Sequence, residues 1–285
     1  MWGLLALYWP LLAGTAALEI LAHRVVWTLV VVALALTLRH RWRWLVELLA
    51  TPRALLVLVA AALLISVNWW LYIWAVTHRH VVEASLGYYI NPLVSVLLAV
   101  VVLGERLDLL RWCAVGLAAL GVTWLTLGYG QPPWISLVLA FSFAGYGLLK
   151  KLATVGSLES VGVETAVLAG PALVYLGWLA TGDRGAFLTG EPGRDVLLAG
   201  AGLVTAAPLL LFATAATRIP LSTLGLLQYL NPTLQLLIGV FLLGETVDAG
   251  QLAGFALVWM ALILLSVAIL RDRQEPAPVA PEAQC

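Results

Sequence analysis

Charged side chains are scarce in this sequence. Asp, Glu, Lys and Arg make up 11% of its 285 residues, whereas an ordinary soluble domain carries about 25%. Apolar residues make up 62% of the chain and the mean hydropathy is +1.00, which excludes such a domain. Apolar runs of about 20 residues recur between short polar breaks, long enough to cross a hydrocarbon core of roughly 30 Å as helices. The period-2 alternation of a membrane barrel is missing, so the sequence predicts an all-α membrane protein.

Other absences narrow the function. Cysteine occurs twice, at Cys113 and Cys285, so no disulfide framework is encoded. No phosphate-cradling glycine loop, zinc-binding helix motif or nucleophile elbow occurs, which argues against an ATP-driven pump or an enzyme and predicts no cofactor and no metal site. A formal net charge of +0 without a dense block of Lys or Arg argues against nucleic acid. The partners that remain are the lipid bilayer and a small-molecule solute.

The chain contains an internal duplication. Residues 86–108 superpose without a gap on residues 226–248, and we call the constant shift between these two stretches the repeat offset. Besides leucines and valines, the coinciding residues are Tyr89/Tyr229, Asn91/Asn231, Pro92/Pro232, Gly104/Gly244, Glu105/Glu245 and Asp108/Asp248. Apolar composition would not produce Asn-Pro and Gly-Glu at one common spacing. The sequence therefore predicts two copies of one unit.

The apolar runs predict ten transmembrane helices, five in each copy. They are expected at residues 1–14, 21–38, 54–76, 82–103, 112–127, 134–149, 162–180, 196–217, 221–243 and 249–270. The first run is short for a span, so the first helix is expected to be truncated. Glycines and prolines at 128–133 predict a hinge between a first repeat at 1–130 and a second at 134–270. The Pro- and Ala-rich residues 271–285 predict a disordered cytoplasmic tail.

An odd number of spans per copy makes the second copy enter the membrane with the opposite polarity, so the repeats are expected to be inverted. The distribution of Lys and Arg gives the orientation. With the N-terminus inside, the inner side holds Arg39, Arg41, Arg43, Arg53, Arg106, Arg111, Lys150, Lys151, Arg218, Arg271 and Arg273. The outer side then holds Arg24, Arg79, Arg184 and Arg194. The inner excess predicts that both termini are cytoplasmic.

Proline inside a membrane helix interrupts its hydrogen bonding. Pro92 frees the carbonyl of Tyr88, and Pro232 frees that of Gln228, because proline has no N–H to donate. Freed carbonyls at membrane depth are tolerated only beside protein or water. Pro208 predicts a third break, in the eighth span.

Asn91 and Asn231 directly precede two of these prolines. Inverted repeats bring such discontinuities together near the midplane, where transporters bind their substrates. The alternative is that the prolines only kink the helices and shape their packing, since proline is common in membrane helices.

Asn68 is the most polar position of an apolar run that also holds Trp69 and Tyr72. One interpretation is a pocket with aromatic walls and an amide that orients a ligand. The other is an interfacial aromatic belt whose amide bonds to a neighbouring helix. Gln228 also needs a polar partner in hydrocarbon, which favours the bundle interior.

Two Gly-Glu pairs end the fourth and ninth spans. Glycine can end a helix in the left-handed conformation, and the acids Glu105 and Glu245 would favour the N-terminal dipole of the helix that follows. The functional alternative for these two acids is a gate or a proton site. Glu83, at the mouth of the fourth span, is a further candidate proton site if the protein is an antiporter.

Three other charged residues lie near predicted span ends. Glu19 and Glu164 are expected to be solvated rather than part of a proton relay. Arg24 is expected to be an interfacial anchor, with binding of a substrate carboxylate as the alternative.

Several stretches resemble the RarD branch of the EamA permeases, in the drug/metabolite transporter superfamily. They are ALEILAHRVVW at 17–27, NWWLYIWAV at 68–76, VEASLGYYINPL at 82–93, AAPLLLF at 206–212 and LGLLQYLNPTLQLLIGVFLLGE at 224–245. The resemblance covers nearly the whole chain. It implies a ten-helix carrier of the bacterial inner membrane, built from two inverted five-helix repeats. In that family the first helix begins well before the Trp-Gly that stands here as Trp2-Gly3.

The resemblance also implies a central cavity and its lining. The side chains expected to bind substrate there are Asn68, Trp69, Tyr72, Tyr88, Asn91, Tyr146, Gln228 and Asn231. Such relatives export amino acids, metabolites or drugs, often in exchange for protons. We therefore expect a secondary-active permease that works by alternating access, with a channel or scramblase and a non-transporting membrane protein as the alternatives.

Overall fold

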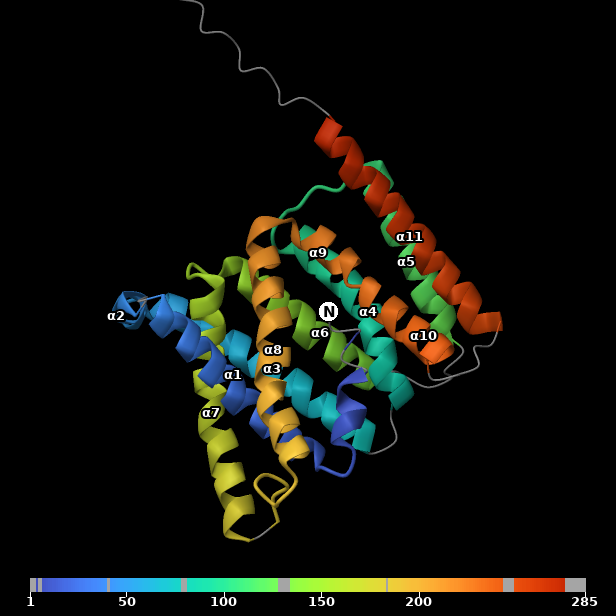
Figure 1. Ribbon diagram of the computed structural model, residues 1–285. Helices are drawn as coiled ribbons and strands as arrows, with labels where there is room; N and C mark the ends of the chain where they lie inside the picture. Colours follow the sequence, from blue (N-terminus) through green and yellow to red (C-terminus); the bar gives the residue numbers. More distant parts are fainter. Residues whose placement is uncertain are drawn as a thin grey trace, which may run out of the picture.

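The computed structural model describes residues 4, 7–39, 42–77, 81–127, 134–182, 184–242 and 249–274 (Figure 1). Within these ranges the chain is helical and contains no strand. The elements are η2 Trp9–Leu12, α1 Ala17–Leu38, α2 Arg43–Leu49, α3 Pro52–Thr77, α4 Val81–Val101, α5 Leu109–Leu127, α6 Trp134–Leu152, α7 Ser157–Thr181, α8 Pro192–Arg218, α9 Leu221–Leu227, α10 Leu230–Leu242 and α11 Ala249–Gln274. The predicted all-α class is confirmed, while the hinge at 128–133 and most of the tail lie outside the described residues.

Many of these helices are long enough to span a membrane. In the described part of the chain, eight segments are long and apolar enough to cross a bilayer, with α9 and α10 taken together as one. Helix α4 adds a shorter apolar stretch, Leu86–Val101. Helix α2 has seven residues, too few to span, and connects α1 to α3.

The helix starts recur at the spacing of the duplication. The starts of α1, α3, α4 and α5, moved by one repeat offset, coincide with the starts of α7, α8, α9 and α11, respectively. Pro52 and Pro192 open the matching helices α3 and α8, a position that suits proline because the first N–H of a helix has no partner within it. The duplication seen in the letters of the sequence is therefore also present in the positions of the helices.

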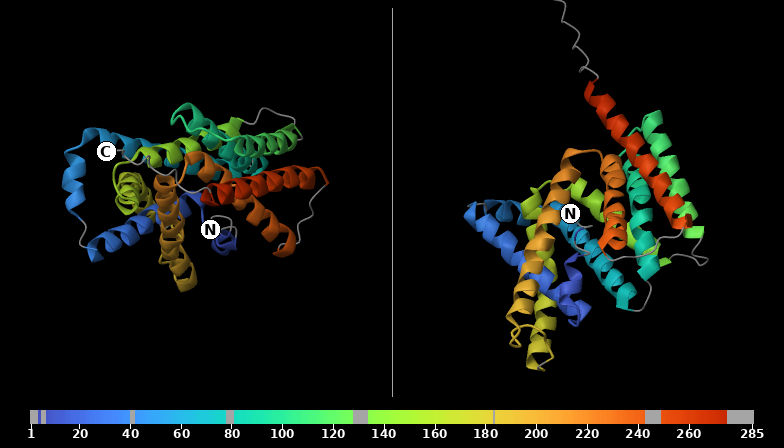
Figure 2. Two further views of the ribbon diagram at one scale, coloured as in Figure 1. Left: turned by 90° about the horizontal axis from the view of Figure 1, so that it is seen from above. Right: turned by 45° about the vertical axis from the view of Figure 1, so that its right-hand side comes forward.

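The two halves of the chain are interleaved. Helix α4 packs mainly on α6, α1 on α7 and α8, and α3 on α6. Helices α5 and α11 lie side by side along one edge of the molecule (Figures 1 and 2). Contacts between helices of the same half are sparser, so each half is completed by the other.

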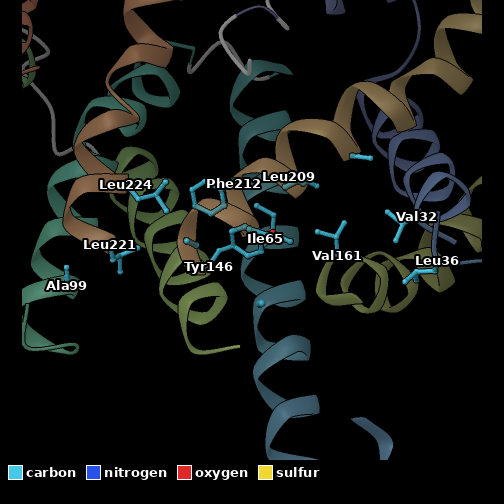
Figure 3. Packing of buried hydrophobic residues seen from close by; sticks show 14 residues of the cluster. Val32, Leu36, Ile65, Ala99, Tyr146, Val161, Leu209, Phe212, Leu221 and Leu224 are labelled. Atoms are coloured by element: carbon cyan, nitrogen blue, oxygen red, sulfur yellow. The ribbon is translucent and has the colours of Figure 1, made fainter. Parts of the chain in front are cut away.

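The largest apolar cluster lies between the halves (Figure 3). It joins side chains of α1, α3, α4, α6, α7, α8 and α9. At its centre Phe212 stacks on Tyr146, with ring centroids 5.9 Å apart and planes 12° apart, and packs on Phe143 at 5.3 Å. In lipid such packing replaces the hydrophobic effect as the force between helices.

Helices α1 and α8 approach each other closely at Gly202. A Cβ placed on Gly202 would lie 2.4 Å from the carbonyl carbon of Trp27, closer than any side chain could be accommodated. The Thr28 hydroxyl donates to the Gly202 carbonyl at 3.2 Å. Only glycine permits this approach.

The end of α4 confirms the predicted left-handed glycine. Gly104 has φ +67°, the left-handed conformation in which glycine ends helices, and the Glu105 N–H returns to the Ala99 carbonyl at 3.0 Å. The prediction that Glu105 favours the start of the next helix along the chain is wrong. That helix, α5, is capped by Asp108, whose carboxylate accepts from the Arg111 N–H at 2.7 Å.

Glu105 instead caps α9, in the other half. Its carboxylate accepts from the Leu221 N–H at 2.7 Å, from the Ser222 N–H at 3.1 Å and from the Ser222 hydroxyl at 2.6 Å. On the other side of the same turn, Lys151 donates to the Ile219 carbonyl at 2.7 Å, at the end of α8. An anion at a helix N-terminus and a cation at a C-terminus both complement the helix dipole, so these two charges hold the α8–α9 turn.

Gly202→Ala is expected to destabilise the protein. The added methyl group meets backbone atoms of α1, which cannot move aside, and overpacking of this kind costs about 1–3 kcal/mol. The measurement is the thermal unfolding midpoint of the purified protein in detergent. Gly170→Ala in α7 is the matched control, because nothing lies within 4 Å of its added Cβ; equal midpoints for the two variants would contradict the close approach.

Glu105→Ala is expected to lower the free energy of unfolding by about 1–2 kcal/mol, the usual effect of losing a helix N-cap. Glu105→Gln keeps one acceptor oxygen and should fall between Ala and the unmodified chain. The control is Glu191→Ala, which removes a partly exposed surface pair with Arg194 worth about 0–1 kcal/mol. Chemical denaturation followed by tryptophan fluorescence compares the variants, and an equal loss for Glu105→Ala and Glu191→Ala would exclude the cap as a stabilising contact.

Candidate functional site

The predicted break in the ninth span is present. Helix α9 ends at Leu227 and α10 begins at Leu230, so the helical hydrogen bonding of the backbone is interrupted just before Asn231-Pro232. The interruption is bridged by tight turns, in which Gln228 N–H bonds to the Gly225 carbonyl at 3.0 Å and Asn231 N–H to the Gln228 carbonyl at 2.9 Å. The other two predicted breaks differ, because Pro92 and Pro208 lie inside helices that continue through them.

A hydrogen bond joins the two halves at this break. The Asn91 side-chain amide, on α4, donates to the Gln228 side-chain carbonyl at 2.7 Å. Asn91 is 4% exposed, and its Oδ1 atom is buried without a partner among the described residues. Asn231 lies one residue into α10. Two of the predicted site residues are thus in direct contact, across a sequence separation of 137 residues.

The amide of Asn68 bonds to a neighbouring helix. Its side-chain nitrogen donates to the Leu139 carbonyl at 2.9 Å and to the Ser142 hydroxyl at 3.0 Å, both on α6. The residue is 8% exposed. Its amide therefore ties α3 to α6.

Arg24 occupies the meeting point of several helices. Its Nε donates to the Thr205 hydroxyl on α8 at 3.1 Å. Its guanidinium carbon lies 4.7 Å from the centroid of the Trp9 ring and 5.0 Å from that of Trp69, within the range of cation–π interaction. The sequence predicted a position at the interface for Arg24, but the side chain is directed among protein groups from both halves.

Two tyrosines complete this group. The rings of Tyr72 on α3 and Tyr88 on α4 meet edge to face at 5.9 Å, their hydroxyls are hydrogen-bonded, and both interact electrostatically with Arg24. We call Arg24, Trp9, Trp69, Tyr72, Tyr88 and Thr205 the Arg24 cluster. All of them except Thr205 are part-exposed, so the predicted residues Trp69, Tyr72 and Tyr88 lie together around a cation that could contact a solute.

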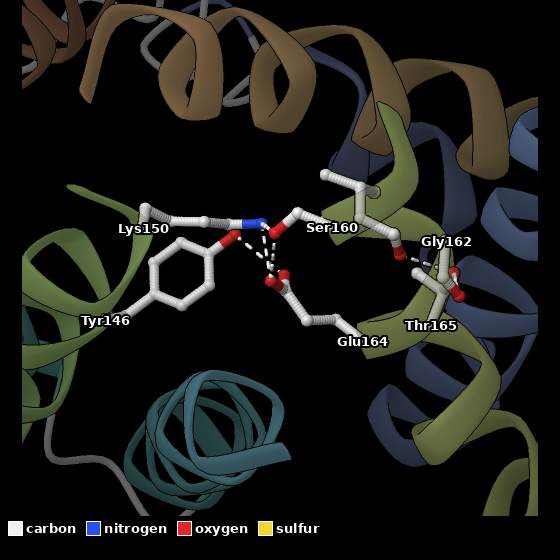
Figure 4. A network of polar contacts seen from close by, with 7 residues as sticks. Tyr146, Lys150, Ser160, Gly162, Glu164 and Thr165 are labelled. Carbon is white, nitrogen blue, oxygen red and sulfur yellow. Dashed lines mark hydrogen bonds and ion pairs between the residues drawn. The ribbon is translucent and has the colours of Figure 1, made fainter. Parts of the chain in front are cut away.

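A buried polar network joins α6 to α7 (Figure 4). Lys150 Nζ donates to Glu164 Oε1 at 2.5 Å and to the Ser160 hydroxyl at 2.7 Å. The hydroxyl of Tyr146, another predicted cavity residue, donates to Glu164 at 3.1 Å, and its side chain is 0% exposed. The donors around Glu164 offset the cost of burying its charge.

The expectation that Glu19 and Glu164 are solvated is wrong, since each is 3% exposed. Helix α7 begins at Ser157, so Glu164 lies two turns inside it rather than at its end. Glu19 is covered by the loop before α8, from which the Ala186 N–H donates to its carboxylate at 2.6 Å.

The side chains of two of the remaining predicted acids are not described by the structure. Glu245 lies outside the described residues, and the side chain of Glu83 is likewise not described. Glu105 caps α9 as given above. Among the described residues no group of three or more His, Cys, Asp or Glu side chains could hold a metal ion.

One cavity lies away from all of these residues. It has a volume of about 320 Å³ and is bounded by α2, the start of α3 and the start of α7. Trp44, Glu47, Thr51 and Glu159 are among its lining residues. None of the residues predicted to bind substrate borders it.

The sequence matches the EamA-like transporter family twice, over residues 1–127 and 133–267. It is similar to Protein RarD of Streptomyces exfoliatus, with 56% identity over 95% of this chain and 86% of the relative. Protein RarD of Escherichia coli K12 is 41% identical over 93% of this chain and 89% of its own length. The Chloramphenicol-sensitive protein RarD of Pseudomonas aeruginosa is 33% identical over 90% of this chain and 87% of its own length.

A solved crystal structure has the same fold. It superposes with a TM-score of 0.68 and 18% identity, over 94% of each chain. The name of the family indicates a transporter rather than an enzyme. With its apolar helices, the chain belongs to the RarD branch of the EamA-like transporter family and is a multi-pass inner-membrane transporter for a small-molecule solute.

Proposed function

We propose that this protein is a secondary-active permease that exports a small organic solute by alternating access. Ten transmembrane helices would form two inverted five-helix repeats, with both termini in the cytoplasm. The recurrence of four helix starts at the repeat offset and the two matches to the family support the repeats. The interleaving of the halves supports a mechanism in which they move against each other about a shared centre.

One observation carries the proposal: the Asn91–Gln228 hydrogen bond beside the α9–α10 break. Non-helical backbone at membrane depth is tolerated only where it is buried in protein or lines a water-filled cavity, which places this break beside such a space. A single side-chain bond between the halves at that point can also be exchanged for a bond to a solute. The Oδ1 atom of Asn91 is buried without a partner among the described residues, which gives a solute donor a place to bind.

Proton exchange is the proposed energy source. Glu83 and Glu245 remain candidate proton sites. Glu105 is less suited, because both of its carboxylate oxygens already accept hydrogen bonds at the start of α9.

Counterflow in proteoliposomes tests the permease. Vesicles are loaded with an unlabelled mixture of amino acids, nucleosides, organic acids and amphenicol drugs, and the entry of labelled traces is followed without an ion gradient. The expected result is transient accumulation of at least one solute. Equilibration without overshoot would indicate a channel or scramblase instead, and the absence of flux for every solute would favour a non-transporting protein.

Asn91→Ala is expected to slow this exchange by more than about tenfold, because a lost bond that leaves a buried polar partner costs about 1–3 kcal/mol. Ser266→Ala is the matched control, since the Ser266 hydroxyl donates within its own helix, to the Leu262 carbonyl. Initial rates are compared at equal amounts of reconstituted protein. Equal rates for the two variants would remove Asn91 from the mechanism.

A further inference from the structure

Arg24 carries a charge that no acid balances within the described residues. It lies in α1, a helix long and apolar enough to span the membrane, where an ionised side chain is costly and is usually retained for function. Its hydrogen-bond partner in the described part of the chain is the neutral hydroxyl of Thr205, at 3.1 Å. The charge of Arg24 is therefore available to a ligand.

The residue at the equivalent position of the second copy differs from Arg24 in its charge and in its partners. The repeat offset places Arg24 on Glu164, and α1 on α7. Glu164 is paired with Lys150 at 2.5 Å, and Ser160 and Tyr146 also donate to it (Figure 4). The second copy therefore supplies its own counter-charge, whereas the described part of the first copy supplies none to Arg24.

The shape of the Arg24 cluster fits one class of counter-ion. Thr205 engages the Nε of Arg24, and the rings of Trp9 and Trp69 lie against the guanidinium, which leaves the terminal nitrogens as available donors among the described residues. Two parallel N–H donors match the two oxygens of a carboxylate. The part-exposed rings of Trp9, Trp69, Tyr72 and Tyr88 offer an apolar, flat surface beside them.

We propose that Arg24 binds the carboxylate of the transported solute while the aromatic side chains of the Arg24 cluster hold its apolar body. The solute class is a small organic monocarboxylate, because in the described part of the chain one cation lies over these rings and balances one negative charge. This assignment rests on the proposed permease function and names the substrate class of that function.

The test uses two matched pairs of probes, benzoate with benzamide and phenylacetate with phenylacetamide. Members of a pair have nearly the same shape and differ in charge. Each is titrated into the purified full-length chain in detergent, and the shift of the thermal unfolding midpoint gives the affinity, since a ligand that binds the folded state stabilises it. The expected result is that the carboxylates raise the midpoint of the unmodified chain and the amides do not.

Variants then locate the site. Arg24→Gln is expected to weaken carboxylate binding roughly tenfold to a hundredfold, the value of a charge-assisted bidentate contact. Arg24→Lys keeps the charge without the fork and should lie between. Arg184→Gln is the matched control, because Arg184 also lies over a tryptophan, Trp178, at 5.3 Å, but is exposed; it should bind as the unmodified chain does.

Three results would overturn the assignment: equal shifts from carboxylates and amides, no shift from either carboxylate, or undiminished binding by Arg24→Gln. If Arg24→Gln does not fold, the comparison of carboxylate with amide on the unmodified chain and the Arg24→Lys variant still decide. The counterflow assay separates this inference from the permease itself. Exchange of neutral solutes alone would retain the permease and reject the carboxylate, whereas Arg24-dependent binding without exchange would retain the site and reject the permease.

Discussion

The hydrogen bonding of the backbone in hydrocarbon is the constraint on which this structure depends. Each N–H and C=O inside the bilayer needs a partner within the protein, so the chain can leave the helical state only where other groups replace the missing bonds. At the α8–α9 turn, which joins two of the spans, Glu105 and Lys151 bond the helix ends. At the α9–α10 break short turns of the backbone itself replace the missing bonds. At both of these points the irregular backbone lies where the two halves of the molecule meet.

The helical class and the duplication could be predicted because they depend on local properties, namely the length of apolar runs and the spacing of Asn-Pro and Gly-Glu. The partners of polar side chains could not. Glu105 reaches a helix 116 residues away, and no local pattern specifies that contact. Glu164 was expected at a helix end because polar residues before Gly162 hid the true start of α7 at Ser157. Its burial follows from that shift.

The two copies differ at matching positions of the repeat, in the backbone and in charge. Helix α4 continues through Pro92, whereas the matching segment is divided into α9 and α10. Arg24 and Glu164 hold opposite charges at the same position of the repeat, and Glu164 is the one paired within the described chain. For Arg24 the sequence offered carboxylate binding only as an alternative to an interfacial anchor, because its partners Thr205 and Trp69 lie on other helices. The matching helices α1 and α7 thus carry different charges with different partners: Glu164 is in an ion pair, and Arg24 bonds to a neutral hydroxyl.

The pairing of α5 with α11 affects how the protein is made. These neighbours are equivalent helices of the two copies, beginning at Leu109 and Ala249, so at about 5–20 residues per second the ribosome needs roughly ten seconds to supply α11 after α5 has emerged. During that interval the face of α5 formed by Ala114, Ala118, Gly121 and Val122 is without its partner. These side chains are small or apolar and tolerate contact with lipid tails. This face of α5 can thus remain against lipid until α11 is inserted beside it.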